Sequence, residues 1–200
     1  MSLIYEPTGR AREYAPLALD LYNGCTHGCL HCRVPADLHR DAVAFHREAR
    51  PRSDLLAKLE RELARQPNGP DNDGDYPPVL LCLTSDPYQP VAAQTGLTRA
   101  AMELLHAHSF PVRVLTKSGT RAVVDFDVIG ERPGDAFGAA LTFADPDDSA
   151  AWEPNAAPPD DRLEALSLAH EHGIRTWATL EPVIDPEQSL EIIRRAHRYV

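Results

Sequence analysis

Short apolar runs recur along the chain and are separated by longer stretches of mixed polarity. Residues 17–22 alternate apolar side chains, which is typical of a strand, and residues 79–84 form a continuous apolar run of strand length. A continuous run favours a strand that is buried on both faces, as in a parallel sheet. The pattern predicts three further strands, at residues 112–116, 137–143 and 174–180.

Amphipathic stretches lie between these strands. Ser53 is a good N-cap, and the leucines after it recur at helical intervals, which predicts a helix over 54–66. The other predicted helices are 98–108, 160–172 with Gly173 as its terminator, and 186–198. Less regular patterns give a candidate helix within 37–50 and a short helix or turn at 121–129. Residues rich in proline, glycine and aspartate predict loops at 67–78 and 145–159.

The resulting order alternates strand and helix through five units. Each pair of parallel neighbours needs a crossover connection, so this alternation predicts an α/β fold with a parallel sheet and helices outside it. A closed eightfold barrel takes about 250 residues, so the 200 residues predict an open, partial β/α barrel. We expect residues 1–16 to be an extended lead-in and 17–200 to be the barrel domain, with room for a further strand beyond Val200.

The polar residues after each strand indicate where the chemistry lies. In such folds, functional residues gather beyond the carboxyl ends of the strands. The five predicted ends carry the cysteine-rich loop 23–32, the segment 84–90, residues 116–118, Thr142 with Asp145, and Glu181 with Pro182. We therefore expect all five to converge on one rim.

The loop after the first strand holds three of the four cysteines, spaced C-x3-C-x2-C at Cys25, Cys29 and Cys32. Gly24 and Gly28 supply backbone that can curl around a shared centre. Thiolates select zinc, copper(I) or iron–sulfur clusters, and three of them leave a fourth position open for chemistry. A structural zinc site is the alternative interpretation, with His27, His31 or Cys82 as its fourth ligand.

Composition narrows the range of partners and compartments. The net charge of −10 disfavours a nucleic-acid partner without excluding one, and the arginines of 47–65 alternate with acidic residues as on a solvated helix. Apolar runs are too short to span a bilayer, and no signal-peptide core precedes residue 14, so no membrane partner is expected. Clustered cysteines fit a reducing compartment, which predicts a cytoplasmic protein.

The cysteine motif after the first strand of a partial barrel resembles the radical S-adenosylmethionine (SAM) superfamily. Within it, the chain looks most like the spore photolyase-like branch. The similar segments cover nearly the whole chain: Gly24-Cys25-Thr26-His27-Gly28-Cys29, Thr84-Ser85-Asp86-Pro87-Tyr88-Gln89-Pro90, Thr116-Lys117-Ser118, and Glu153-Pro154 followed by Arg162.

This resemblance implies a [4Fe-4S] cluster on the three cysteines and SAM on its fourth iron. One electron, from a donor such as flavodoxin or ferredoxin, would cleave SAM and release a 5′-deoxyadenosyl radical. The implied SAM-contacting residues are His31, Ser85, Asp86, Lys117 and Ser118, with Thr142 and Glu181 as weaker candidates. Asp86 has an alternative role as the cap of a turn before Pro87.

One departure leaves the substrate open. Spore photolyase has a hydrogen-donating cysteine immediately before its Thr-Ser-Asp, whereas this chain has Leu83 there and Cys82 one residue earlier. Successive strand residues face opposite sides, so Cys82 is expected to point away from Ser85. No catalytic residue is identified beyond the cluster ligands. The alternatives to a SAM-cleaving enzyme are a zinc-stabilised binding module and an inactive cluster-binding homologue.

Overall fold

The computed structural model describes residues 2–65 and 76–200. A six-stranded sheet has the order β1-β2-β5-β6-β7-β8, and a separate two-stranded ribbon pairs β3 with β4. The main strands are β1 (Ile4–Tyr5), β2 (Leu17–Leu19), β5 (Val79–Leu81), β6 (Val112–Thr116), β7 (Ala136–Ala140) and β8 (Thr176–Thr179). The ribbon consists of β3 (Tyr22–Asn23) and β4 (Arg50–Pro51).

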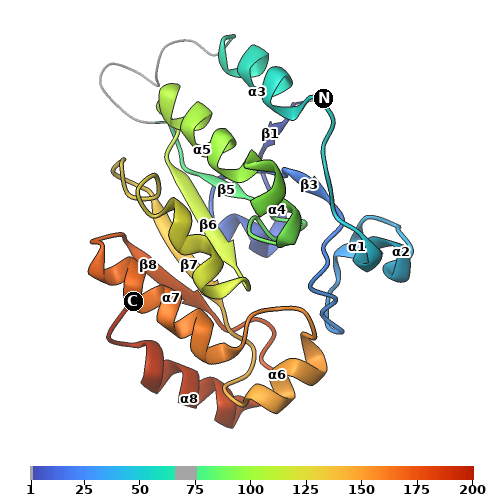
Figure 1. The fold of residues 1–200 in the computed structure, drawn as a ribbon, viewed down its shortest axis with the longest axis vertical. Coiled ribbons are helices and arrows are strands. Elements are labelled where there is room, and N and C mark those ends of the chain that lie inside the picture. Colours follow the sequence, from blue (N-terminus) through green and yellow to red (C-terminus); the bar gives the residue numbers. More distant parts are fainter. Residues whose placement is uncertain (1, 66–75) are drawn as a thin grey trace.

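Strands β2 to β8 of the large sheet are parallel and follow one another in chain order. The two edge strands of this sheet do not pair, so it forms an open, partial β/α barrel. The fold class predicted from the alternating pattern is therefore confirmed. Figure 1 shows the strands side by side, with β8 at the edge opposite β1.

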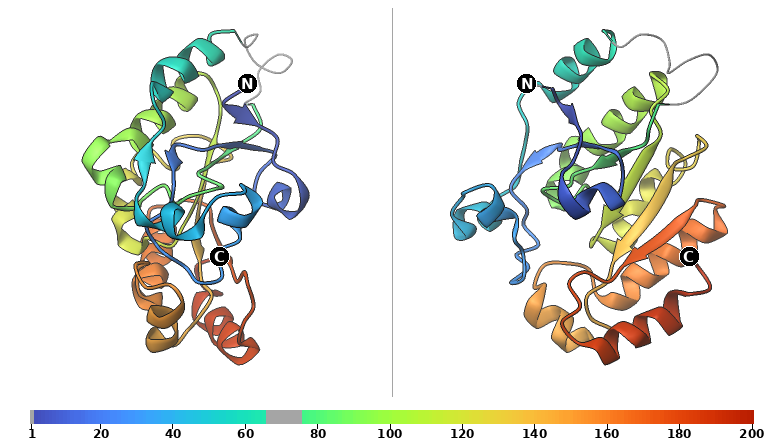
Figure 2. Two further views of the ribbon diagram at one scale, coloured as in Figure 1. Left: turned by 90° about the vertical axis from the view of Figure 1, so that its right-hand side faces the viewer. Right: turned by 180° about the vertical axis from the view of Figure 1, so that it is seen from behind.

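Helices connect the parallel strands. Those of the described chain are α1 (Val34–Asp37), α2 (Ala42–Arg47), α3 (Leu55–Leu63), α4 (Pro90–Thr95), α5 (Leu97–Ala107), α6 (Pro146–Trp152), α7 (Pro159–Glu171) and α8 (Pro186–Ala196). Two 3-10 helices are η1 (Gly9–Glu13) and η2 (Gly119–Asp125). Helices α3, α5 and α7 cover one face of the sheet (Figure 2). No helix of the described residues is long and apolar enough to cross a bilayer.

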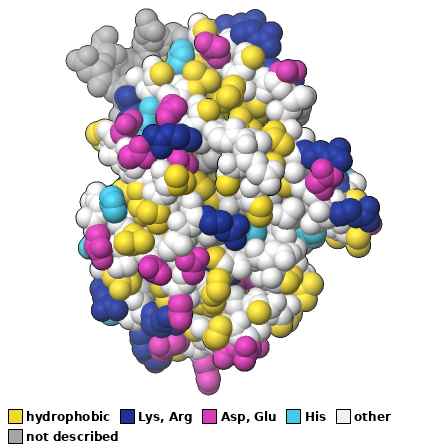
Figure 3. Space-filling view, in the orientation of Figure 1, with side chains coloured by type: hydrophobic (Ala, Val, Ile, Leu, Met, Phe, Trp, Pro, Cys, Tyr) yellow, Lys and Arg dark blue, Asp and Glu magenta, His cyan; other side chains and the backbone are white. Residues whose placement is uncertain are grey.

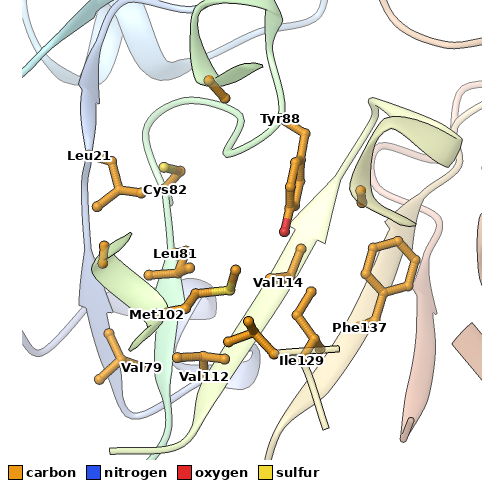
Figure 4. Close-up of a cluster of buried hydrophobic side chains, with 14 of the residues drawn as sticks. Leu21, Val79, Leu81, Cys82, Tyr88, Met102, Val112, Val114, Ile129 and Phe137 are labelled. Atoms are coloured by element: carbon orange, nitrogen blue, oxygen red, sulfur yellow. The ribbon is translucent and has the colours of Figure 1, made fainter. Parts of the chain in front are cut away.

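The main core lies between these helices and the sheet. Figure 4 shows Leu81, Val114 and Phe137 of the strands clustered with Met102 of α5. All four side chains are fully buried or nearly so. Burying a side chain of this size contributes about 2 kcal/mol, so this layer holds the strands in register beneath the rim.

The N-terminal segment covers part of the opposite face. Strand β1 pairs antiparallel with β2, and Tyr14 packs against Trp177, with ring centroids 5.5 Å apart. Arg113 donates from Nη1 to the carbonyl oxygen of Tyr14 over 2.6 Å. Residues 1–16, expected to be an extended lead-in, thus contribute a strand and a 3-10 helix that pack on the sheet.

The predicted loop at 145–159 contains a helix, α6. Asp145 caps its N-terminus by accepting from the backbone N–H of Asp147 over 2.8 Å, and Pro146 occupies the first turn. These are ordinary helix-starting residues. The candidate helix at 37–50 is two short helices, α1 and α2, and most predicted strands are shorter than their apolar runs. Residues 66–75 lie outside the described chain and include most of the predicted loop at 67–78.

The surroundings of His106, near the end of α5, indicate that the free energy of unfolding depends on pH. Its imidazole lies 3.2 Å from Asp135 Oδ1 and 3.3 Å from Glu131 Oε2. Burial acts to lower the pKa of His106, but the hydrogen bond and charge of Asp135, with help from Glu131, outweigh it and raise the pKa. The stabilisation is present below the ordinary pKa and is lost as pH rises through the raised one.

We therefore expect His106→Gln to lower the free energy of unfolding at both pH values, and to lower it by about 1 kcal/mol more at pH 6 than at pH 9. Urea titrations of both proteins at the two pH values measure this difference. An equal difference at both values would mean that His106 stays neutral in the folded protein.

Candidate functional site

The cysteine loop follows β3 and depends on two glycines with positive φ. Gly24 has φ +84°, and a Cβ there would lie 2.3 Å from the carbonyl oxygen of Glu48. Gly28 has φ +67°, a conformation that side chains with a Cβ rarely adopt. The loop can close against Glu48, the residue that follows α2, only because residue 24 has no side chain.

Gly24→Ala is expected to lower the free energy of unfolding by more than about 2 kcal/mol, because it adds a clash to an unfavourable φ. The matched control is Gly96→Ala, which has φ +62° and no atom within 4 Å of the added Cβ. Urea denaturation followed by circular dichroism measures both. Equal losses in the two variants would show that contact with Glu48 does not shape the loop.

Three neighbouring segments hold the cysteine loop. Cys25 donates its backbone N–H to the carbonyl oxygen of Phe45 at the end of α2, over 3.2 Å. The side chain of Gln89 accepts from the backbone N–H of Thr26 over 3.1 Å, and Leu30 donates to the carbonyl oxygen of Trp152 over 2.8 Å. The loop is therefore fixed from α2, from the segment after β5 and from the end of α6.

The three loop cysteines are free thiols, and all are partly exposed. Burial raises the pKa of Cys25 to about 12 and that of Cys29 to about 11, so these thiols stay protonated at neutral pH. Burial raises the pKa of Cys32 as well. Binding of a soft metal centre would have to displace these protons.

The structure also separates the candidates for a fourth zinc ligand. Cys29, His31 and Glu153 offer ligand atoms within 4.8 Å of one another, and in the described chain the three cysteines form no such compact set. His27 instead lies against Asp86 and Ser118, with its Nε2 3.2 Å from Ser118 Oγ. Cys82 is buried in the main core (Figure 4). Of the candidate fourth ligands, only His31 belongs to this compact set.

Glu153 is the centre of a buried polar cluster beside the loop. Its Oε1 lies 2.6 Å from Lys117 Nζ, 2.9 Å from His31 Nε2 and 2.8 Å from Thr142 Oγ1. Its Oε2 lies 2.6 Å from Arg162 Nη1, although the two groups are not aligned for a hydrogen bond. We call Glu153 and these four partners the Glu153 cluster. It joins the cysteine loop to the residue after β6, to α7 and to the segment after β7.

The charges of the Glu153 cluster do not cancel. Burial alone would raise the pKa of Glu153, but the hydrogen bond with His31 and the charges of Lys117 and Arg162 outweigh it and depress the pKa well below 4.5. Glu153 is therefore ionised, and two cations face one carboxylate. This excess positive charge favours an anionic group nearby.

A second polar cluster forms around Asp86. Its carboxylate accepts from Thr116 Oγ1 and Ser118 Oγ, over 2.8 and 2.9 Å, and from the backbone N–H of Lys117 over 2.8 Å. It also accepts from the backbone N–H of Tyr88, two residues on, as a turn-capping aspartate does. Asp86 thus fastens the segment after β5 to the end of β6 and fixes the backbone at Lys117.

Two predicted site residues stand apart from these clusters. Ser85 Oγ is buried, and its side chain interacts with the Cys82 thiol rather than with either cluster. Strand alternation was expected to point Cys82 away from Ser85. Cys82 lies just beyond the end of β5 and has φ +62°, so strand alternation does not apply to it. Glu181 lies elsewhere, 2.5 Å from both Tyr14 Oη and Arg10 Nη2.

The structure adds two residues that the strand-end rule does not identify, and it gives a role to Gln89, which lies in the segment 84–90 that this rule places at the rim. Glu153 and Arg162 complete the Glu153 cluster, and Gln89 binds the cysteine loop. Glu153 and Arg162 lie in segments noted in the sequence, but nothing local signals that they pair. The sequence signal available beforehand is the similarity of Glu153-Pro154, followed by Arg162, to the spore photolyase-like branch.

Comparisons with known proteins give structural matches only. No family model matches the sequence, and the search of curated proteins found no match. Spore photoproduct lyase complexed with dinucleoside spore photoproduct matches with a TM-score of 0.71 and 17% identity, over 97% of this chain and 55% of that chain. A mutant of that enzyme with bound AdoMet and dinucleoside spore photoproduct matches with a TM-score of 0.70 and 17% identity, over 92% of this chain and 52% of that one.

A second enzyme shares the fold more distantly. OxsB, a cobalamin-dependent S-adenosylmethionine radical enzyme, matches with a TM-score of 0.54 and 11% identity, over 88% of this chain and 26% of that chain. The chain thus spans about half the length of the spore photoproduct lyase chain. The predicted resemblance to radical SAM enzymes is confirmed in the architecture: this chain has the partial β/α barrel fold of spore photoproduct lyase and OxsB.

Proposed function

We propose that the chain is an enzyme that binds a [4Fe-4S] cluster through Cys25, Cys29 and Cys32 and reductively cleaves SAM. The observation that carries this proposal is the position of the three free thiols on a closed loop at the rim of this fold, next to the Glu153 cluster. A cluster is larger than a single ion, so its ligand sulfurs stand further apart, which agrees with cysteines that form no compact set.

Zinc is the weaker interpretation of the same residues. Glu153 would have to be a ligand in the compact set, yet both of its oxygens already lie against Lys117, Arg162 and other partners. Coordinating an ion would leave buried cations without their counter-ion, which is costly. The thiol-rich loop therefore suits a cluster better than a mononuclear site built on Glu153.

The residues near the loop suit the polar groups of SAM. The ammonium of Lys117 has three donors, and Glu153 and Thr142 take two of them. The third can bind a carboxylate, and such a contact is a charge-assisted hydrogen bond. The excess positive charge of the Glu153 cluster favours the SAM carboxylate further.

With a cluster bound, the chemistry supplied would be one-electron cleavage of SAM to methionine and a 5′-deoxyadenosyl radical, which abstracts hydrogen from a substrate. The chain's own part is to position the groups and to exclude water. His31, held on Glu153, presents an imidazole beside Cys29 that can stack on the adenine. Asp86 fixes the backbone of Lys117, and Ser118 supports Asp86, so both act as positioning residues.

The substrate is not assigned. Leu83 stands where spore photolyase carries its hydrogen-donating cysteine, so repair of a thymine dimer by the same route has no support here. Reduction of the bound cluster would require a one-electron donor such as flavodoxin or ferredoxin.

The test is anaerobic reconstitution of the chain with iron and sulfide, followed by SAM and excess dithionite. We expect about four irons per chain and formation of 5′-deoxyadenosine, measured by chromatography. Four irons without deoxyadenosine would support the inactive cluster-binding homologue instead. Tight zinc without iron uptake would overturn the proposal in favour of the binding module.

A further inference from the structure

Helices α1 and α2 project from the sheet beside the cysteine loop (Figure 1). We call residues 33–52 the α1–α2 segment. Its first residue follows Cys32 directly, and its second helix, α2, contacts Cys25, because Phe45 accepts from the Cys25 backbone and His46 Nδ1 lies 2.9 Å from the Cys25 carbonyl oxygen. A protein bound to this segment would lie against the backbone that carries two of the three cysteines.

The α1–α2 segment is basic, although the chain as a whole has a charge of −10. It contains five arginines against three acidic residues. Asp37 pairs with Arg33 and Glu48 with Arg50, whereas in the described chain no carboxylate pairs with Arg40 or Arg47, both of which are exposed. Figure 3 shows Lys and Arg side chains with hydrophobic neighbours on this side of the molecule.

Large apolar side chains lie exposed around these arginines. Leu30, between Cys29 and His31, is 70% exposed, and Val43 of α2 is 67% exposed. Leu38, at the end of α1, is 42% exposed. Apolar residues among charges that steer approach are the usual composition of a transient protein interface.

The charge and composition also indicate the class of partner. A second copy of this chain is acidic overall, but its negative charge is spread over its surface. A strongly acidic carrier protein would complement the two unpaired arginines better. Single-stranded nucleic acids are held by exposed aromatic side chains, and the only aromatic ring of the segment apart from histidine, Phe45, is buried. An acidic protein fits this surface best.

We propose that the α1–α2 segment, with Leu30, is the docking surface for an acidic one-electron carrier protein. This inference rests on the proposed function. In the complex, one electron passes from the reduced carrier, which is oxidised, to the cluster, which is reduced, and no bond is formed or broken. The surface brings the carrier to the backbone that holds Cys25 and Cys32.

The test uses the reconstituted chain and flavodoxin as the acidic carrier. The variant is Arg40→Glu with Arg47→Glu, and the matched control is Arg61→Glu with Arg194→Glu, two exposed arginines on α3 and α8. We expect the Arg40/Arg47 variant to weaken flavodoxin binding, measured by flavin fluorescence at low salt, by about tenfold or more. Deoxyadenosine formation driven by limiting reduced flavodoxin should fall by about the same factor.

Excess dithionite separates docking from catalysis, because it reduces the cluster without a protein partner. With dithionite we expect the variant to match wild type, and the control to match wild type with both reductants. High salt should remove most of the difference in flavodoxin binding. Val43→Ser provides a second variant that leaves the charge unchanged and should also weaken flavodoxin binding.

Three results would overturn the inference. Equal flavodoxin binding by wild type and the Arg40/Arg47 variant would exclude the surface. A loss with dithionite as large as the loss with flavodoxin would place these arginines in substrate binding, including binding of a nucleic acid. Absence of deoxyadenosine from wild type with dithionite would refute the proposed function, and the docking proposal would fail with it.

Discussion

Alanine in place of Cys25, Cys29 or Cys32 is expected to reduce deoxyadenosine formation from SAM by more than about a hundredfold and to reduce the iron content. Each thiolate would fill a coordination position that no other side chain of the loop can take. His27 is committed to Asp86 and Ser118, and His31 to Glu153. Iron and sulfide per chain, together with chromatography of the nucleoside, measure both effects.

Cys82→Ala is the matched control for these three variants. Cys82 is 4% exposed and belongs to the main core, so its loss should cost about 1 kcal/mol of stability and leave iron binding intact. A loop variant that retains four irons and full activity would remove that cysteine from the ligand set. A Cys82 variant that loses its iron would show that the core thiol takes part after all.

Local patterns were sufficient where a segment is specified by its own residues. Strand β6 has the residues predicted for it, because Val112, Val114 and Thr116 alternate with less buried neighbours and are themselves buried. Helix α7 lies within one residue of its predicted bounds, since Leu163 and Leu166 lie one turn apart in it and Gly173 follows it with φ +75°. In both cases one short stretch carries the whole signal.

Other elements depend on distant partners and could not be predicted in the same way. Strand β1 is only two residues long and exists because Ile4 and Tyr5 pair with Leu19 and Ala18 of β2. The apolar runs of β5 and β7 continue past the point where pairing stops, so their predicted ends were too long. Helix α6 was missed because the many prolines and aspartates around it suggested a loop.

The same distinction between local and distant determinants applies to the candidate site. The rim and its cysteines followed from motif spacing and from the rule for strand ends. His31, Lys117 and Thr142 do meet, but they meet at Glu153, a residue that the sequence offered only as part of a similar segment. Charge pairing between five separate segments cannot be inferred from spacing, and neither can the distance of Glu181 from this cluster.

Replacing Glu153 with glutamine is expected to lower the free energy of unfolding at pH 7 by about 3–5 kcal/mol, because Lys117 and Arg162 would remain buried without their counter-ion. The matched control is Glu181→Gln, which removes an exposed carboxylate with its own arginine and should cost less than about 1 kcal/mol. Urea denaturation followed by circular dichroism measures both. Equal, small losses would mean that water or a rearranged side chain compensates for the missing charge.

If Glu153→Gln does not fold, Thr142→Val provides a milder variant. It removes one neutral hydrogen bond to the same oxygen and should lower the free energy of unfolding by about 1 kcal/mol.

The pH dependence distinguishes a charge effect from a packing effect at Glu153. The pKa of this carboxyl is depressed in the folded protein, so the unfolded chain binds its proton first as the solution is acidified. The stabilisation from Glu153 is therefore full above the ordinary pKa of 4.5 and is lost as pH falls toward the depressed value. The difference between wild type and Glu153→Gln should shrink steadily from pH 5 to pH 3, by about 1.4 kcal/mol per pH unit at most. A difference that stays constant over this range would show that Glu153 contributes through shape and hydrogen bonding rather than through its charge, and would remove the excess-charge argument for an anionic ligand at the rim.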